Sequence, residues 1–202
     1  MKVTILSEAG YSEALFGLGL SHGVTSGLVF ENVCSIRKSG EPEWRTDEYK
    51  RMEGVAQKLA GKGLGHDKFT RMIQVWLDVT ASLTWWKQAD TYRIGTTVQS
   101  SSTMHTLHKT PITQKLFDVE ISIGQLKFLE DLRQCYNETK DMEVWESLIG
   151  NLPNSFLQRR IVNCNYAVLA NIIYQRRGHK LGAWAIFITA IRSQAQHPEL
   201  LP

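Results

Sequence analysis

The chain is organised around Asp90-Thr91-Tyr92-Arg93-Ile94-Gly95-Thr96-Thr97-Val98-Gln99-Ser100-Ser101-Ser102-Thr103-Met104-His105. Most of its last eleven residues are Gly, Thr, Ser, Gln or His, and apolar and aromatic sequence flanks the stretch. Hydroxyl side chains offer hydrogen-bond donors and acceptors, and glycine lets the backbone approach a ligand closely. This composition predicts a binding surface, while a polar loop or strand that joins two core elements is an equally good interpretation.

The composition predicts one ordinary globular domain over residues 1–202. The hydrophobic share is 43%, the charged share is 21%, and the formal net charge is +3. A chain of this length buries a sizeable core. An excess of three positive charges is too small to indicate a general nucleic-acid binder, so we expect no nucleic-acid partner.

The cysteine and histidine spacings favour neither a disulfide framework nor a metal site. Cys34, Cys135 and Cys164 are odd in number and far apart, and His105 and His108 have no cysteine or carboxylate at zinc-ligand spacing. We expect reduced, structural cysteines, no metal, no membrane association and a cytoplasmic location (the host cytoplasm for a viral protein). No apolar run is long enough for a signal peptide or a membrane span.

The hydrophobic patterns predict strands mainly in the first half of the chain and helices in the second. Thr46 or Asp47 is the expected N-cap of one helix, and Ser12 of another. We expect strands at 3–6, 28–30 and 75–81, and helices at 12–20, 47–59, 85–88, 123–132, 144–149, 155–177 and 181–191. The helix at 155–177 is expected to be long and largely buried.

Two basic groups flank that predicted helix: Arg159-Arg160 and Arg176-Arg177-Gly178-His179-Lys180. Arginine forks bind phosphate oxygens in a bidentate manner, so the two groups could converge on a nucleotide phosphate. In the alternative interpretation, the second group simply complements the dipole at a helix C-terminus.

Three segments together resemble the flavin-dependent thymidylate synthases, especially divergent bacteriophage members. Gly65-His66 followed by Phe69 is similar to the family's Gly-His segment before a strand. Gly95 to His105 lies without gaps over the second part of the signature RHRxxSxNExSxRY, with Thr97 and Ser102 on its two serines. Leu152-Pro153 is followed by Asn165 and Arg176 at the family's spacings of thirteen and eleven residues.

The resemblance implies an α+β (α/β) fold with a mixed sheet, long helices and a helical C-terminal half, assembled as a homotetramer with FAD between subunits. It also implies transfer of a one-carbon group from methylenetetrahydrofolate to C5 of a dUMP-like nucleotide, with NADPH as reductant. The implied cofactor-binding residues are His66, Lys68, Tyr92, Arg93, Thr97, Gln99 and Asn165. The implied substrate-binding residues are Ser100, Ser102, Arg159, Arg160 and Arg176, of which Ser102 and Arg176 are also the candidate catalytic residues.

The chain departs from the family signature at its arginines. The Arg-His-Arg triplet aligns with Tyr92-Arg93-Ile94, and the closing Arg-Tyr aligns with Met104-His105. Because such arginines hold phosphates, their loss favours an alternative function: a non-catalytic nucleotide- or flavin-binding protein that keeps the fold.

Overall fold

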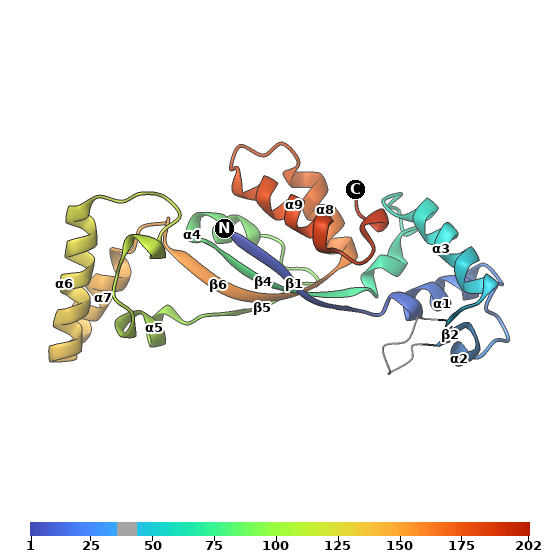
Figure 1. Cartoon of the computed structure of the whole chain (residues 1–202), viewed down its shortest axis with the longest axis horizontal. Coiled ribbons are helices and arrows are strands. Elements are labelled where there is room, and N and C mark those ends of the chain that lie inside the picture. The colour runs from blue at the N-terminus through green and yellow to red at the C-terminus, as the bar shows by residue number, and fades with distance from the viewer. Residues whose placement is uncertain (36–43) are drawn as a thin grey trace.

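The computed structural model describes residues 1–35 and 44–202, and a four-stranded sheet lies at its centre (Figure 1). The strands are β1 (Lys2–Ala9), β4 (Gln74–Ser82), β6 (Leu157–Asn165) and β5 (Thr97–Ser100), in the order β1-β4-β6-β5. Every neighbouring pair is antiparallel. The α+β class is therefore confirmed. The expected mixture of parallel and antiparallel strands is not found in this sheet, which is antiparallel throughout.

One face of this sheet is covered by two helices, α8 (Tyr166–Arg176) and α9 (Ala183–Gln194) (Figure 1). The alternate residues Val75, Leu77, Val79 and Ala81 of β4 are buried on that side, because successive strand side chains point to opposite faces. On the opposite face, no helix of the described residues packs against the sheet (Figure 1).

Helices extend from both ends of the sheet (Figure 1). Near one end lie α1 (Tyr11–Ser21), α2 (Phe30–Val33), α3 (Asp47–Leu59), the 3-10 turn η1 (Lys68–Arg71) and the short hairpin β2 (Cys34–Ser35) and β3 (Trp44–Arg45). Near the other end lie α5 (Thr103–Thr106), η2 (Leu107–Lys109), η3 (Gln114–Leu116), α6 (Ile123–Thr139) and α7 (Met142–Gly150). α4 (Leu83–Ala89) follows β4, and η4 (Pro198–Leu200) ends the chain.

The end that contains α6 and α7 has a hydrophobic core of its own. Its buried residues are Leu107, Ile112, Phe117, Leu129, Trp145, Leu148 and Phe156. The helices α1, α3, α8 and α9 share the main core with the sheet. The molecule is thus one chain with a central core and a smaller helical lobe.

Local sequence signals predicted most of these elements. The Thr46 hydroxyl accepts a hydrogen bond from the Tyr49 amide, which confirms the predicted cap of α3. The strands expected at 3–6 and 75–81 and the helices expected at 12–20, 85–88, 123–132, 144–149 and 181–191 are also confirmed, with small shifts of their ends.

Two smaller predictions are wrong. α1 begins at Tyr11 after Gly10, and the Ser12 hydroxyl is hydrogen-bonded to the Tyr49 hydroxyl instead of capping a helix. The strand expected at 28–30 does not form, because Phe30 begins the short helix α2.

The most consequential error concerns the long helix expected at 155–177. Its first half is β6, whose helix-covered face carries Gln158, Arg160, Val162 and Cys164. Two of these four side chains are polar, so the alternation of apolar and polar residues that marks a strand is absent from the sequence. β6 forms because it pairs with β4 on one side and β5 on the other. Only the second half, α8, is helical.

Candidate functional site

The candidate site is built around Arg176, the last residue of α8. Its Nε donates a hydrogen bond of 2.8 Å to the Tyr92 hydroxyl, and its guanidinium carbon lies 4.8 Å from the Trp184 ring centroid. The Tyr92 hydroxyl in turn donates to Oε1 of Gln175 at 3.0 Å. Within the described part of the chain, the two terminal nitrogens of Arg176 have no hydrogen-bond partner. The guanidinium is therefore oriented by its neighbours and keeps donors for a ligand.

The C-terminal end of α8 stabilises the positive charge of Arg176 and fixes its position. Arg176 lies in the last turn of the helix, where a cation is stabilised by the unpaired carbonyls. The amide of His179 donates to the carbonyl of Arg176, and its Nδ1 accepts from the Leu181 amide. These bonds fix the turn after α8, so the position of Arg176 is set by the backbone as well as by Tyr92.

Arg160 projects from β6 on the same face of the sheet. Its NH1 donates to Oδ1 of Asp90 at 2.8 Å, and its guanidinium lies 4.3 Å from the Trp86 ring centroid. Ser100 is its partner in the register between β5 and β6. Because Asp90 balances its charge, Arg160 has less unpaired charge to offer an anion than Arg176 has.

Arg159 projects from the opposite face of the sheet. It forms a bidentate ion pair with Asp78, in which NH2 lies 2.5 Å from Oδ2. The hydrogen bond from Arg159 is the main reason that the pKa of Asp78 lies below its usual value, and the same bond raises the pKa of Arg159. Adjacent residues of a strand cannot converge, so the expectation that Arg159 and Arg160 together meet the basic group at Arg176 is wrong.

The polar stretch at 90–105 is divided between three local structures. Residues 90–96 form a loop, 97–100 form β5, and 103–106 form α5. Thr97 and Gln99 face the uncovered side of the sheet, whereas Ser100 faces the side of Arg160. Ser102 precedes α5, and within the described residues its hydroxyl makes no capping hydrogen bond. The predicted hydroxyl surface is thus present but is split between two faces.

Asn165 lies at the opposite end of α8 from Arg176. Its Oδ1 accepts a hydrogen bond of 3.0 Å from the Val168 amide and so caps the helix. Eleven residues of helix separate the two side chains by about 16 Å. The two side chains are therefore too far apart to bind the same group of a ligand.

Gly95 fixes how closely the loop packs against that helix. Its φ is +73°, and a Cβ there would lie 3.2 Å from Val168 Cγ2 and 3.3 Å from Asn165 Nδ2. A side chain at this position would be strained by the backbone conformation and crowded by α8. Glycine is therefore required for the loop to lie where it does.

His66 and Lys68 lie elsewhere, in a hollow of about 510 Å³ between α1 and η1. Its wall also includes His22, Leu59 and Met72. No residue lines both this hollow and the cavity beside the loop that carries Tyr92 and Arg93. Within one chain the expected flavin-binding residues thus fall into two separate groups.

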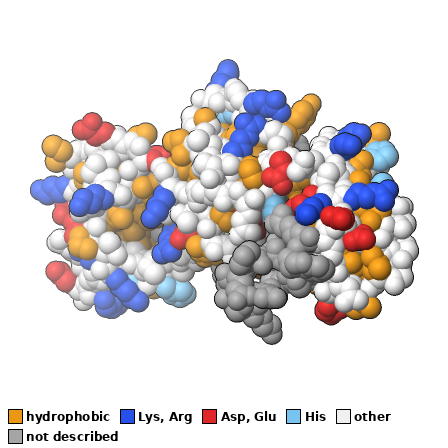
Figure 2. Space-filling view, turned by 45° about the vertical axis from the view of Figure 1, so that its right-hand side comes forward, with side chains coloured by type: hydrophobic (Ala, Val, Ile, Leu, Met, Phe, Trp, Pro, Cys, Tyr) orange, Lys and Arg blue, Asp and Glu red, His pale blue; other side chains and the backbone are white. Residues whose placement is uncertain are grey.

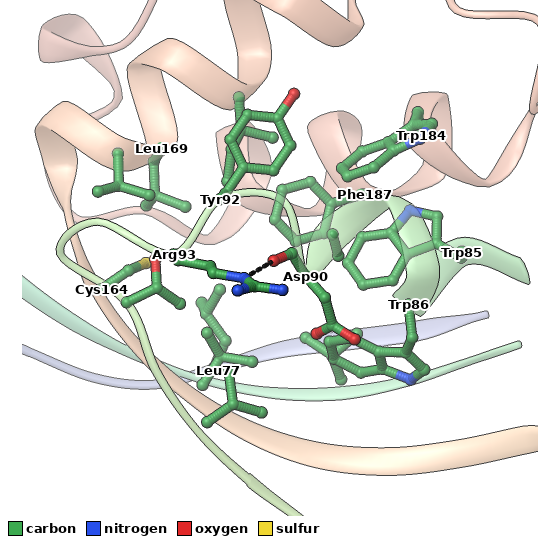
Figure 3. Close-up of a pocket in the computed structure, with 17 residues that line it drawn as sticks. Leu77, Trp85, Trp86, Asp90, Tyr92, Arg93, Cys164, Leu169, Trp184 and Phe187 are labelled. Atoms are coloured by element: carbon green, nitrogen blue, oxygen red, sulfur yellow. Dashed lines mark hydrogen bonds between the residues drawn. The ribbon is translucent and has the colours of Figure 1, made fainter. Parts of the chain in front are cut away.

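A second hollow, of about 380 Å³, lies between the sheet, α4, the loop 90–96, α8 and α9 (Figure 3). Five aromatic side chains line it: Trp85, Trp86, Tyr92, Trp184 and Phe187. Trp85 and Trp86 are adjacent residues of α4. Both are buried, 3% and 2% exposed, and both line this cavity.

Neither a metal site nor a single basic patch stands out. Residues 1–35 and 44–202 contain no group of three or more His, Cys, Asp or Glu side chains that could hold a metal ion. On the face in Figure 2, Lys and Arg side chains are dispersed over the centre and both ends. In the same described residues, no helix is both long and apolar enough to cross a membrane. The local setting of each arginine, rather than the total charge, therefore decides where an anion binds.

Comparison with known proteins places the fold. No protein-family model matches the chain, and no curated protein sequence gives a significant match. Among solved structures, the flavin-dependent thymidylate synthase ThyX of Helicobacter pylori, complexed with FAD and dUMP, matches with a TM-score of 0.73 and 14% identity over 100% of this chain and 98% of that chain. A second structure of ThyX from the same organism, also with FAD and dUMP, gives a TM-score of 0.72 and 12% identity over 100% and 97% of the two chains. The chain therefore has the fold of the flavin-dependent thymidylate synthases along its whole length, as its sequence motifs suggested.

Proposed function

We propose that this protein binds FAD and a dUMP-like nucleotide and transfers a one-carbon group from methylenetetrahydrofolate to C5 of the pyrimidine. The observation that carries the proposal is the oriented Arg176, whose terminal nitrogens have no hydrogen-bond partner among the described residues. The similar structures, which match over the whole chain, contain FAD and dUMP, and this supports the same pair of ligands here.

In this proposal Arg176 binds the nucleotide phosphate. Tyr92 and Trp184 hold its guanidinium in one orientation, so little conformational entropy is lost when the anion binds. Ser100 and Ser102 supply hydroxyl groups near Arg160, whose charge is shared with Asp90. The contribution of these residues is to position the pyrimidine and to stabilise charge, and no protein nucleophile is required.

The flavin is assigned to residues from more than one subunit. Asn165 and the loop at 90–96 are on one part of the chain and the hollow of His66 and Lys68 is on another, so one subunit does not bring them together. The hollow fits an anionic cofactor, because His22, His66 and Lys68 lie on its wall and Gly65 next to them has open space at its Cβ position. When bound, a reduced flavin supplies hydride equivalents, which NADPH would replenish.

The uncovered face of the sheet supports assembly into the homotetramer that this arrangement needs. Trp76 is one of the exposed large apolar residues, and it lies on this face together with Ile161. An apolar sheet face is usually covered by another element or by another chain. We therefore assign this face to the contact between subunits.

A visible absorption spectrum of the purified protein tests the proposal. We expect bound flavin, or uptake of added FAD, and a shift of the flavin absorbance when dUMP is added. Arg176→Gln should keep the flavin but lose the dUMP-dependent shift, whereas Arg177→Gln, a neighbouring exposed arginine, should behave as the unchanged protein does. A protein that takes up no FAD at any concentration would contradict the assignment.

A second candidate function is nucleotide or flavin binding without catalysis. Arg159 and Arg160 each form an ion pair with an aspartate. Among the described residues, Arg176 is then the arginine at a family-matched position that has no carboxylate partner, and a site with so few available arginines favours this second function. Complementation of a thymidine-auxotrophic bacterium separates the two functions. Growth without thymidine would establish the enzyme, whereas flavin and dUMP binding without growth would support the binding protein.

A further inference from the structure

The aromatic-lined cavity has features that the proposed nucleotide and flavin sites do not use. Its volume of about 380 Å³ falls in the range of small-molecule sites. Its inner wall is apolar and comes from β4, β6, α4, α8 and α9, and polar side chains are confined to the side formed by the loop at 90–96 (Figure 3). A site with an apolar interior and one polar side suits a ligand that has an apolar body and one polar group.

Two buried polar atoms on this wall have no hydrogen-bond partner. Only three such side-chain atoms occur in the described residues, and two of them, Trp85 Nε1 and Thr96 Oγ1, belong to residues that line this cavity. The indoles of Trp86 and Trp184, which also line it, donate to the Gln158 carbonyl and to Gln88 Oε1. Buried donors without partners are uncommon and costly, which points to partners that a ligand supplies.

Arg93 provides the charge at the polar side. Figure 3 shows its side chain lying across the cavity, with Nε hydrogen-bonded to the carbonyl of Asp90 at 3.2 Å. Among residues 1–35 and 44–202, no carboxylate forms an ion pair with it, because the Asp90 carboxylate is bonded to Arg160. Its terminal nitrogens therefore remain available, and the Thr96 hydroxyl lines the same side.

We propose that this cavity binds a small aromatic carboxylate. The one- or two-ring body packs among Trp85, Leu169 and Phe187, where aromatic faces and edges favour a flat ring. The carboxylate is bound by the Arg93 guanidinium, whose fork matches two oxygens, and by the Thr96 hydroxyl. The site shares the loop at 90–96 with the flavin contact proposed above, but its interior differs from the dUMP and FAD sites, since neither Arg176 nor His66 lines it.

The test is calorimetric titration of the full chain, without FAD or dUMP, with 2-naphthoate and with its neutral analogue 2-naphthamide. We expect 2-naphthoate to bind more tightly than 2-naphthamide. Arg93→Gln should weaken 2-naphthoate about tenfold or more and leave 2-naphthamide nearly unchanged, because only the carboxylate loses a charge-assisted contact. Arg51→Gln, which removes an exposed arginine of α3, is the matched control and should change neither affinity.

Substitutions that fill the cavity test whether the compounds bind inside it. Val168→Trp introduces a large ring from a half-buried wall position of α8 and should abolish binding of both compounds. If that variant fails to fold, as judged by circular dichroism, Ala89→Phe fills the cavity from α4. The proposal is overturned if the unchanged protein does not bind 2-naphthoate, if a folded filled variant still binds it, or if Arg93→Gln affects both compounds equally. Because no flavin or nucleotide is present, these outcomes do not depend on the proposed function.

Discussion

The hydroxyl of Tyr92 accepts a hydrogen bond from Arg176 Nε at 2.8 Å, although the two residues are 84 positions apart in the chain. The same hydroxyl donates to Gln175, and the Trp184 ring lies beside the guanidinium. A loop that follows α4 thus orients the arginine at the end of α8. The site depends on this long-range contact more than on any single motif.

Tyr92→Phe tests whether the hydroxyl positions Arg176. The ring contact with Arg176 is retained, but the guanidinium loses its hydrogen-bond acceptor. We expect dUMP affinity, measured from the flavin absorbance change, to fall about two- to tenfold, because the lost bond orients Arg176 and does not itself contact the nucleotide. Tyr174→Phe, on the helix α8 that carries Arg176, is the control, because its exposed ring contacts Arg177 instead. An equal loss of dUMP affinity in this variant would contradict a specific role for Tyr92.

Arg176→Lys and Arg176→Gln separate charge from geometry. Lysine keeps the charge but cannot donate in a bidentate manner, and glutamine keeps neither. We expect dUMP binding to weaken about tenfold for lysine and about a hundredfold for glutamine, since charge-assisted contacts are lost in turn. Equal affinities for all three proteins, measured by calorimetry, would remove Arg176 from the nucleotide site.

Ile161→Arg tests the assignment of the uncovered sheet face to subunit contacts. Ile161 pairs with Asp78 of β4 and Gln99 of β5, so its side chain points to the uncovered face. A charge buried without a partner at an interface is costly, and sedimentation should show smaller species than the tetramer. Ile186→Arg, at an exposed position of α9 on the other side of the sheet, should leave the assembly unchanged.

His108 should make the stability of the helical lobe depend on pH. The centroid of its ring lies 5.8 Å from those of the Tyr136 and Trp145 rings, and its buried Nδ1 has no hydrogen-bond partner among the described residues. Loss of hydration, and to a lesser extent nearby cations such as Lys109, lower its pKa below the ordinary 6.5. The unfolded chain therefore binds the proton more tightly, and the free energy of unfolding should decrease as the pH falls through 6.5.

His108→Phe keeps an aromatic ring at this position but cannot be protonated. Urea denaturation on either side of pH 6.5 should show a smaller pH dependence for this variant than for the unchanged protein. His105→Gln, at an exposed histidine three residues away, serves as the control. If His108→Phe retains the full pH dependence, the effect arises from another group.

Glu130 should stabilise the same lobe above acidic pH. It accepts hydrogen bonds from Arg133 and from the Ile112 amide, and the bond from Arg133 is the main cause of a pKa lowered from 4.5 to about 2. Arg133 also donates to the His108 carbonyl. Since the folded pKa is depressed, the stabilisation is fully present above 4.5 and is lost as the pH falls towards 2.

Glu130→Gln should therefore lower the free energy of unfolding at neutral pH by about 1.5–3 kcal/mol, the usual range for hydrogen bonds to a charged group. The difference from the unchanged protein should shrink as the pH falls below 4.5. Glu138→Gln, an exposed position on the same helix, should have little effect at either pH. A difference that does not change with pH would indicate that the carboxylate charge is not involved.

The sequence by itself determined the elements whose signals are local. The Thr46 cap of α3, the alternation along β4 and the apolar stripes of α6 and α7 act between residues a few positions apart, so they can be read from one chain. The Gly95–His105 motif also indicated the fold, because its spacing matches a known signature and Gly95 is required by its backbone conformation.

Tertiary structure alone decided the rest. β6 is a strand because β4 and β5 flank it, although its own residues favoured a helix. Because of that pairing, Arg159 forms an ion pair with Asp78 on one face of the sheet and Arg160 forms one with Asp90 on the other. Arg176 instead donates a hydrogen bond to Tyr92. Side-chain partners far apart in the sequence are set by strand register and by helix packing on the sheet, and these depend on the whole chain having folded.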